Sequence, residues 1–231
     1  MRIIIAGWLF TVVRLIIDRS LHDKFPGLAT LLLVIEGVRV EKSRDDLERY
    51  KADSCQKFRN RYSLETLKDV PELRAYRDFF WRVGIDPTKI RPASEALLRR
   101  VMQGKELPRI NTLVDSYNIA SMETHVPLAV FDVARLRSDL TMRMAFAGEK
   151  FMGIGMTAEE TLTGKEVVVE DAGRLVAIYP YRDADDSKVT LATDSVVVLV
   201  CGVPGISVEH LENSKSAAIE HITRFCGGRC Q

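Results

Sequence analysis

The chain has 231 residues, of which 46% are apolar and 28% are charged, and its formal net charge is +1. These values exclude a disordered chain and a polycation, and they suffice for one sizeable hydrophobic core or two small ones packed together. The apolar run at residues 3–13 is too short for a bilayer, which takes about 20 apolar residues, and no clean signal-peptide cleavage site follows it. We expect a buried strand or helix there, or a non-native extension, and no membrane partner.

Charge is unevenly distributed along the chain. Residues 74–109 contain nine Lys or Arg against four Asp or Glu, whereas residues 110–231 contain eleven against seventeen. A basic segment on an acidic body is suited to orienting a polyanion such as RNA. The alternative is a pair of solvated helix faces, and both interpretations remain open at this point.

The four Cys residues include no Cys-x-x-Cys pair, and the four His residues have no metal-binding spacing. Cys226 and Cys230 enclose only Gly-Gly-Arg, which is too sparse for a four-ligand zinc site. We therefore expect no metal, no cofactor and no disulfide framework, and a reducing, cytoplasmic location.

The first half of the chain has mainly helical periodicity. An apolar, β-branched stretch at residues 28–40 predicts a buried strand with an irregularity at Gly37. Beyond this stretch, apolar residues recur at spacings of three and four residues, which is typical of helices. The predicted helices cover residues 43–60, 63–83 with a new start at Pro71, 91–104, and 111–121.

The second half is rich in strand patterns. Asp-Ala-Gly-Arg at residues 171–174 predicts a hairpin turn between two of these strands. Predicted strands cover residues 127–132, 143–147, 165–170, 175–178 and 195–200, and a helix covers residues 207–225. The sequence thus predicts one α+β domain, with a helical N-terminal half and a strand-rich C-terminal half around a mixed sheet.

The most informative polar stretch is Ile-Asn-Thr-Leu-Val-Asp-Ser-Tyr-Asn at residues 110–118. If this stretch is helical, Asn111, Asp115 and Asn118 share one face, because they stand at i, i+4 and i+7. Two amides and a carboxylate offer donors and acceptors to a polar ligand. They are equally suited to capping neighbouring backbone and fixing the fold, so the stripe predicts residues that either line or brace a pocket.

Arginines surround this stripe in the sequence, and arginine is suited to bidentate phosphate contacts. The predicted RNA-binding residues are Arg91, Arg99, Arg100 and Lys105. Asp183, Asp185 and Asp186 form an acidic cluster, for which a solvated loop is a commoner explanation than a cation site. No Gly-x-Ser-x-Gly or Cys–His pattern indicates a nucleophile, so the sequence assigns no catalytic residue.

Three motifs resemble those of one family. Residues 110–118 resemble the Ile-Asn-x-Val-Val-Asp-x-x-Asn signature of B3/B4 domains, which carry the editing site in the β subunit of phenylalanyl-tRNA synthetase. Pro-Leu-Ala-Val-Phe-Asp at residues 127–132 is similar to the family's Pro-x-His-Ala-Phe-Asp, and Cys-Gly-Val-Pro-Gly at residues 201–205 to Ala-Gly-Val-Met-Gly. The segment at residues 76–100 is closer to free-standing members. The resemblance implies a B3/B4-like domain at residues 25–225, an N-terminal apolar segment at 1–24 and a tail at 226–231.

In the synthetase, this domain hydrolyses tyrosine wrongly attached to the phenylalanine tRNA, using a His and a Glu among other groups. The resemblance places Ala129 at the position of that His and Ser207 at the position of that Glu, so both functional groups are replaced in this chain. It implies a ligand pocket that includes Asn111, Asp115, Asn118, Ala129, Gly202, Gly205 and Ser207.

Three functions follow from the resemblance. The first is a trans-editing deacylase that hydrolyses a mischarged aminoacyl-tRNA ester. The second is a non-catalytic module that binds tRNA or a free amino acid, and the third is a structural partner in a larger complex. The sequence lacks an ATP-binding motif and the aminoacylation domain, so the chain by itself is not a synthetase. In the first two cases, the expected partners are tRNA or aminoacyl-tRNA and a small amino-acid ligand.

Overall fold

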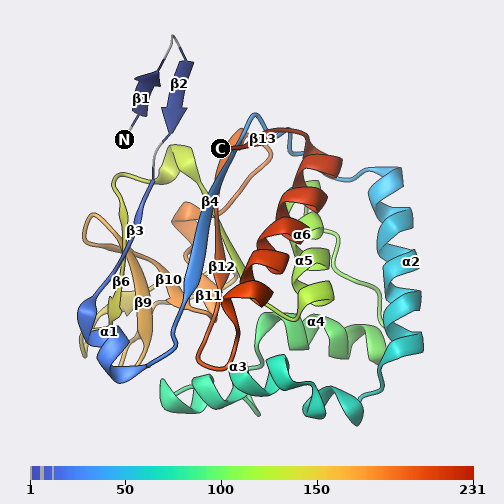
Figure 1. Ribbon diagram of the computed structural model, residues 1–231, viewed down its shortest axis with the longest axis horizontal. Helices are drawn as coiled ribbons and strands as arrows, with labels where there is room; N and C mark the ends of the chain where they lie inside the picture. Colours follow the sequence, from blue (N-terminus) through green and yellow to red (C-terminus); the bar gives the residue numbers. More distant parts are fainter. Residues whose placement is uncertain (1, 6–7, 12) are drawn as a thin grey trace.

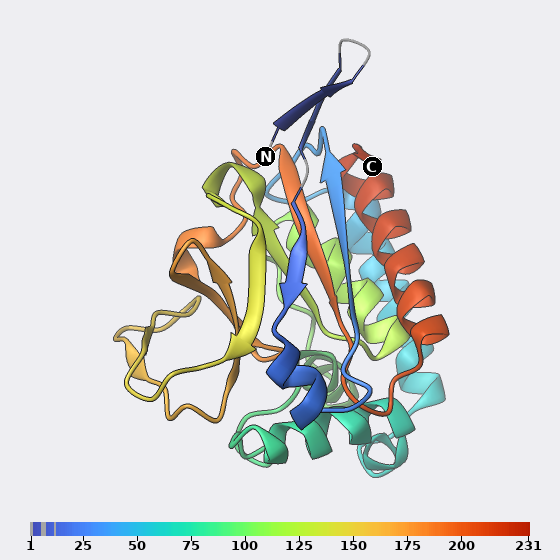
Figure 2. The same cartoon turned by 60° about the vertical axis from the view of Figure 1, so that its left-hand side comes forward.

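The computed structural model describes residues 2–5, 8–11 and 13–231. Its elements form three layers: a layer of helices, a four-stranded sheet in the middle and a five-stranded sheet on the far side (Figures 1 and 2). Helices α3 (Pro71–Arg82) and α4 (Ala93–Met102) lie at one end of these layers, at the bottom in Figure 1.

The four-stranded sheet is antiparallel throughout, with the strand order β13-β4-β12-β5. Its central strand β12 reads Ser-Val-Val-Val-Leu-Val-Cys, and all but the first of these residues are buried. A continuous apolar run without alternation is typical of a strand covered on both faces. The strands are β4 (Thr30–Glu36), β5 (Leu128–Asp132), β12 (Ser195–Cys201) and β13 (Arg229–Cys230).

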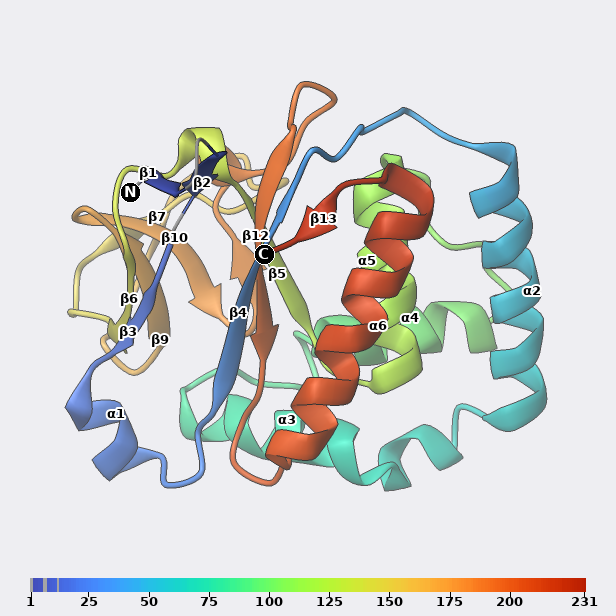
Figure 3. The ribbon, with the colours of Figure 1, turned by 45° about the horizontal axis from the view of Figure 1, so that its top comes forward.

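Helices α5 (Thr112–Thr124) and α6 (Val208–Cys226) pack against each other over one face of this sheet, and α2 (Asp45–Arg61) lies outside them (Figure 3). Both inner helices start at side-chain caps. The Asn111 side chain accepts a hydrogen bond from the Val114 amide, and the Ser207 hydroxyl accepts one from the His210 amide. These caps satisfy amides that have no partner within the helix.

The five-stranded sheet has the order β11-β10-β9-β6-β3. It is mixed, because β3 runs parallel to β6 while the other pairs are antiparallel. The predicted turn between β9 and β10 is present, with positive φ values at Ala172 and Gly173. The strands are β3 (Leu15–Ile17), β6 (Leu140–Met144), β9 (Val167–Asp171), β10 (Arg174–Tyr179) and β11 (Arg182–Asp183).

One predicted strand is shifted. The sequence places it at residues 143–147, whereas β6 covers Leu140–Met144. The buried carboxylate of Asp171 accepts hydrogen bonds from the backbone amides of Arg137 and Ser138, just before β6 begins. These hydrogen bonds fix the chain just before β6, and β6 starts three residues earlier than its apolar pattern predicts.

The remaining elements are short or lie at the lower end in Figure 1. The segment before residue 25 contributes β3 to the five-stranded sheet, and its preceding strands β1 and β2 pair with each other. The predicted tail contributes β13, which pairs with β4. These elements are β1 (Arg2–Ile5), β2 (Trp8–Thr11), α1 (Arg19–Lys24), η1 (Thr66–Asp69), α3 (Pro71–Arg82), α4 (Ala93–Met102), η2 (Val133–Arg135), β7 (Lys150–Phe151), β8 (Glu160–Thr161) and η3 (Asp185–Ser187).

One large hydrophobic core joins the two halves of the chain. The ring of Phe79 on α3 contacts Phe25 at a centroid distance of 5.1 Å and Tyr179 on β10 at 6.4 Å, so residues far apart in the sequence meet in one cluster. The prediction of a single α+β domain is confirmed. No helix in the described part of the chain is both long and apolar enough to cross a membrane. Of the apolar run at residues 3–13, the structure describes only the side chain of Val13, which is buried; the predicted burial of residues 3–12 lies outside the described side chains.

A buried ion pair connects α2 to α5. The Nζ atom of Lys51 lies 2.6 Å from Oδ2 of Asp115, and both side chains are almost fully buried. Lys51 also donates to Glu48 and to the carbonyl of Pro108, while the second oxygen of Asp115 accepts from the Ile110 amide. Burial raises the pKa of the Asp115 carboxyl, against the lowering effect of the Lys51 hydrogen bond. Removing Lys51 would therefore leave the Asp115 carboxylate buried without a cation.

We therefore expect Lys51→Met to lower the free energy of unfolding by about 3 kcal/mol, the cost typical of breaking a buried pair from one side. The double variant Lys51→Met with Asp115→Leu should recover most of that loss, because no charge is then left behind. Lys57→Met, on an exposed position of the same helix, is the control and should be nearly neutral. Urea unfolding monitored by circular dichroism measures the free energy of unfolding of all three variants. A Lys51→Met variant as stable as the Lys57→Met control would contradict the structural role of the Lys51–Asp115 pair.

Candidate functional site

A pocket of about 160 Å³ opens at the junction of the two sheets. Strands β5 and β11 are edge strands of different sheets, and they meet here with the start of α4 and the middle of α5. Such a volume accommodates a small ligand group rather than a large cofactor. The pocket is lined by Ala93, Tyr117, Asn118, Pro127, Leu128, Ala129, Ala177, Ile178, Tyr179, Pro180, Tyr181, Arg182, Asp183 and Cys201.

Asp183 is the carboxylate of this pocket. Its Oδ2 atom accepts a hydrogen bond of 3.2 Å from the Val130 amide of β5, which ties the two sheets together. Burial raises the pKa of Asp183 to about 7, and the Val130 hydrogen bond opposes this only in part. A carboxyl group with this pKa exchanges its proton near neutral pH, which is the property required of a general acid or base.

Two further polar side chains of the pocket have no protein partner. Among the residues that the structure describes, neither the Tyr117 hydroxyl nor the Asn118 amide makes a hydrogen bond, although both side chains line the pocket. Burial raises the pKa of Tyr117 far above its ordinary value, so its hydroxyl stays protonated and is a hydrogen-bond donor. The pocket therefore offers free donors beside a carboxylate.

The inner wall of the pocket is fixed at the end of β12. The Tyr76 hydroxyl donates to the carbonyl of Cys201 at 2.6 Å, and the Tyr179 hydroxyl donates to the carbonyl of Gly202. A Cβ atom on Gly202 would lie 2.3 Å from the Ala29 carbonyl oxygen, so no other residue fits there without a backbone shift. These contacts hold Cys201 rigidly in the pocket wall.

A shallow groove lined by cations lies along α4 and the loop that follows it. Helix α4 borders both this groove and the pocket, because Ala93 lines the pocket while Ala96 lines the groove. All four predicted RNA-binding residues line it, and one further cation joins them: Lys89, Arg91, Arg99, Arg100 and Lys105.

Glu95 is a buried carboxylate that pairs with arginines of this groove. Its side chain is fully buried, and its Oε1 atom lies 2.6 Å from Nε of Arg99 and 4.0 Å from Nε of Arg91. Its other oxygen lies 3.2 Å from Nε of Arg77. One carboxylate among three guanidinium groups leaves the cluster with a net positive charge, which an anion would complement.

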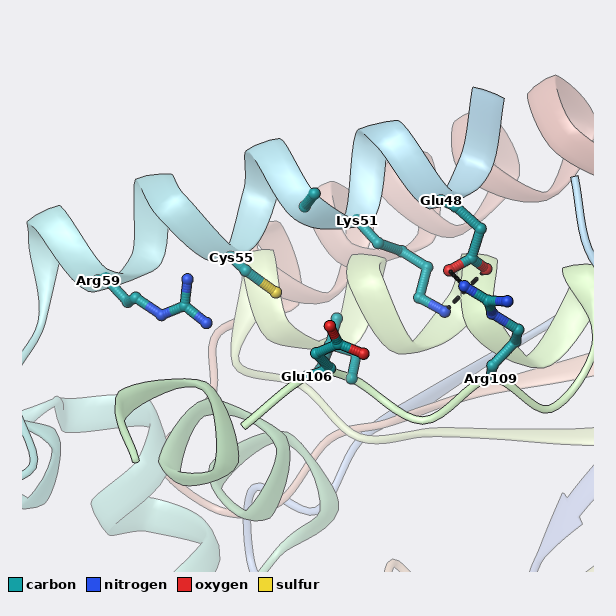
Figure 4. A pocket seen from close by; sticks show the side chains of 8 residues that line it. Glu48, Lys51, Cys55, Arg59, Glu106 and Arg109 are labelled. Atoms are coloured by element: carbon teal, nitrogen blue, oxygen red, sulfur yellow. Dashed lines mark hydrogen bonds and ion pairs between the residues drawn. The ribbon is translucent and has the colours of Figure 1, made fainter. Parts of the chain in front are cut away.

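A second hollow, of about 350 Å³, lies between α2 and the loop before α5 (Figure 4). It combines three cations with two carboxylates, and its two ion pairs join Glu48 to Lys51 and to Arg109. Glu48, Lys51 and Arg109 are therefore engaged with one another. No group of His, Cys, Asp or Glu side chains within residues 2–5, 8–11 and 13–231 is arranged to hold a metal ion.

The structure brings together only part of the predicted ligand set. Asn118 and Ala129 line the pocket. Asn111 and Ser207 act as helix caps, and Asp115 pairs with Lys51. Gly202 and Gly205 do not line the pocket: the Gly202 carbonyl accepts from the Tyr179 hydroxyl, and Gly205 adopts a positive φ of 101° in the following turn. Their roles in ligand binding thus remain predictions.

Asp183 is the site residue that sequence reasoning assigned to a solvated loop. It differs from its two neighbours, because Asp185 pairs with Lys188 and Asp186 pairs with Arg174, whereas Asp183 turns into the pocket. The signal was the stretch Tyr-Pro-Tyr-Arg-Asp at residues 179–183, where a buried strand ends in a tyrosine and a proline and a second tyrosine follow directly. A stretch of this composition favours a packed segment over a solvated loop.

Comparisons with known proteins agree with this architecture. The β subunit of phenylalanine–tRNA ligase from Symbiobacterium thermophilum is 32% identical over 111 residues, which is 48% of this chain and 12% of that protein. The corresponding subunit from Nocardia farcinica is 32% identical over 115 residues, 50% of this chain and 13% of that protein. The matched region of each relative is thus only about an eighth of its length.

A solved structure shares the fold: the N-terminal fragment of the phenylalanyl-tRNA synthetase β subunit from Pyrococcus horikoshii. It superposes with a TM-score of 0.52 and 14% identity, covering 95% of this chain and 50% of that one. The family model described as "B3/4 domain" matches residues 75–226, about two thirds of the sequence. The resemblance drawn from the three sequence motifs is therefore confirmed, and the chain belongs to the B3/4 domain family.

Proposed function

We propose that the protein is a cytoplasmic aminoacyl-tRNA deacylase that acts in trans, hydrolysing the ester between an amino acid and the end of its tRNA. The observation that carries this proposal is the position of α4, which borders both the small polar pocket and the cationic groove. An aminoacyl-tRNA has the matching pair of features: a small amino acid attached to a large polyanion.

The pocket is suited to the aminoacyl end. Its volume of about 160 Å³ fits one small organic group, and its walls are largely apolar around a few polar atoms. The Asn118 amide and the Tyr117 hydroxyl are donors suited to the oxygen that becomes negative when water attacks an ester carbonyl. No metal or cofactor enters this proposal, because positioning and oxyanion stabilisation suffice for ester hydrolysis.

The alternative is a module that binds tRNA or an amino acid without turnover. Ala129 favours this alternative, since it lines the pocket where the synthetase domain carries a His. The relatives named above are tRNA ligase subunits, which supports an RNA partner under either function. A deacylase breaks the ester, whereas a binding module leaves it intact, so a hydrolysis assay separates the two functions.

We expect the purified protein to hydrolyse at least one aminoacyl-tRNA on the order of 100-fold faster than the uncatalysed rate, the gain typical of a positioned acid or base. The assay follows loss of labelled amino acid from tRNAs charged correctly or wrongly, with a reaction without protein as the control. Tight binding of charged tRNA without faster hydrolysis identifies the binding module. A protein that neither binds nor hydrolyses any charged tRNA would overturn both functions.

A second expectation concerns the groove. Arg100→Glu with Lys105→Glu should weaken tRNA binding roughly tenfold at low salt, because two phosphate contacts become repulsive. These two residues are preferable to Arg99, whose removal would leave the buried Glu95 without its closest partner. Lys42→Glu with Arg49→Glu is the control: it changes the net charge equally at exposed positions outside the groove.

Filter binding or fluorescence anisotropy at several salt concentrations measures this effect. For the unchanged protein, the affinity should fall steeply with salt, since each neutralised phosphate releases counterions. Equal weakening in both double variants would show that only the overall charge matters and that the groove is not the RNA-binding surface.

A further inference from the structure

We propose that Asp183 is the catalytic base of this pocket, the group that removes a proton from the attacking water. This inference rests on the proposed hydrolysis of an aminoacyl ester, and it places the base on β11 rather than on β5, where Ala129 stands at the position of the family's His. It would explain how a chain with Ala129 and Ser207 at the two expected positions retains turnover.

The geometry separates Asp183 from every other acid in its neighbourhood. Its Oδ2 atom accepts one hydrogen bond from the Val130 amide, and within the described residues its Oδ1 atom has no partner and no cation pairs with the carboxylate. The adjacent Arg182 does not compensate, because its guanidinium donates to the Ile154 carbonyl and lies over the Tyr181 ring. A carboxylate that lines a pocket without a counter-charge is costly unless it has a function.

The other elements around the pocket supply no competing base. Helix α5 contributes Tyr117, β10 contributes Tyr179, and β12 contributes Cys201, and burial raises the pKa of all three groups. They therefore stay neutral at pH 7. Strand β5 contributes only Leu128 and Ala129, and α4 contributes Ala93. Tyr181 and Arg182 complete the ionisable groups of the lining.

The reaction balances with this one carboxylate. Asp183 takes a proton from water while the water oxygen bonds to the ester carbonyl carbon, giving a tetrahedral oxyanion that Asn118 and Tyr117 are placed to stabilise. The bond from that carbon to the ribose oxygen then breaks. The ribose oxygen takes the proton back from Asp183, and the amino acid leaves after losing its own carboxyl proton to solvent. The base is regenerated, and no oxidant or metal is consumed.

The test compares Asp183→Asn with Asp185→Asn, a substitution two residues away in the same acidic cluster but outside the pocket. The substrate is the labelled aminoacyl-tRNA that the unchanged protein hydrolyses fastest in the panel above. We expect Asp183→Asn to lower kcat by about 10²–10⁴-fold, with little change in KM or in tRNA affinity, while Asp185→Asn keeps the original rate. Circular dichroism confirms that both variants are folded.

The pH profile provides a signature that a merely structural role would not give. A general base works as the carboxylate, so kcat of the unchanged protein, corrected for the uncatalysed rate, should rise with pH and level off above the pKa of about 7. The residual rate of Asp183→Asn should lack this rise. A rate for Asp183→Asn within threefold of the original overturns the inference but leaves the deacylase intact.

One more comparison separates a base from an anchor for the substrate's ammonium group. An α-hydroxyacyl-tRNA, made by nitrous acid treatment of the same substrate, has a hydroxyl group in place of the ammonium. If Asp183 is the base, this ester is hydrolysed and depends on Asp183 just as strongly. If the unchanged protein hydrolyses only the ammonium form, Asp183 is an anchor and the inference is wrong. If the unchanged protein hydrolyses nothing, the proposed function itself fails.

Discussion

The structure depends on how the end of β12 is held. Strand β12 lies between β4 and β5. The carbonyls of its last residue, Cys201, and of the next residue, Gly202, accept hydrogen bonds from two tyrosines that belong to different layers. Tyr76 comes from α3 and Tyr179 from β10, so one short segment connects the end helices, the four-stranded sheet and the five-stranded sheet. Because a buried carbonyl without a partner is costly, these bonds fix the relative position of all three. The pocket lies against this connection.

Local patterns in the sequence were sufficient for the fold class and for most elements. The Val-rich run of β12, the Asp-Ala-Gly-Arg turn and the starts of α5 and α6 are all features of neighbouring residues, and each appears in the structure close to its predicted place. The start of β6 was misplaced because Asp171, far along the chain, determines it through the amides of Arg137 and Ser138. The errors thus arise where a distant residue decides the local geometry.

The candidate site follows the same rule. Asp115 and Asn118 lie on α5 as predicted, whereas Asn111 lies just before the helix, in an extended conformation, and caps it. Only Asn118 reaches the pocket, because Lys51 of α2 pairs with Asp115. No sequence pattern reveals that Lys51 is buried. Asp183 was visible as one of three neighbouring acids, but only the pairing of β11 with β10 and its contact with β5 distinguish it from Asp185 and Asp186.

The hydrogen bond from Val130 to Asp183 also has a thermodynamic consequence. It joins the edge strands of two separate sheets, and the pocket exists only while those sheets stay in register. Any compound that fills the pocket touches both sheets, so it binds the native state and not a form in which the sheets have parted. By mass action such a ligand stabilises the fold by RT ln(1 + [L]/Kd), about 2.7 kcal/mol at a hundredfold excess over Kd. A rise in melting temperature would thus reveal a ligand of this pocket before any reaction is known.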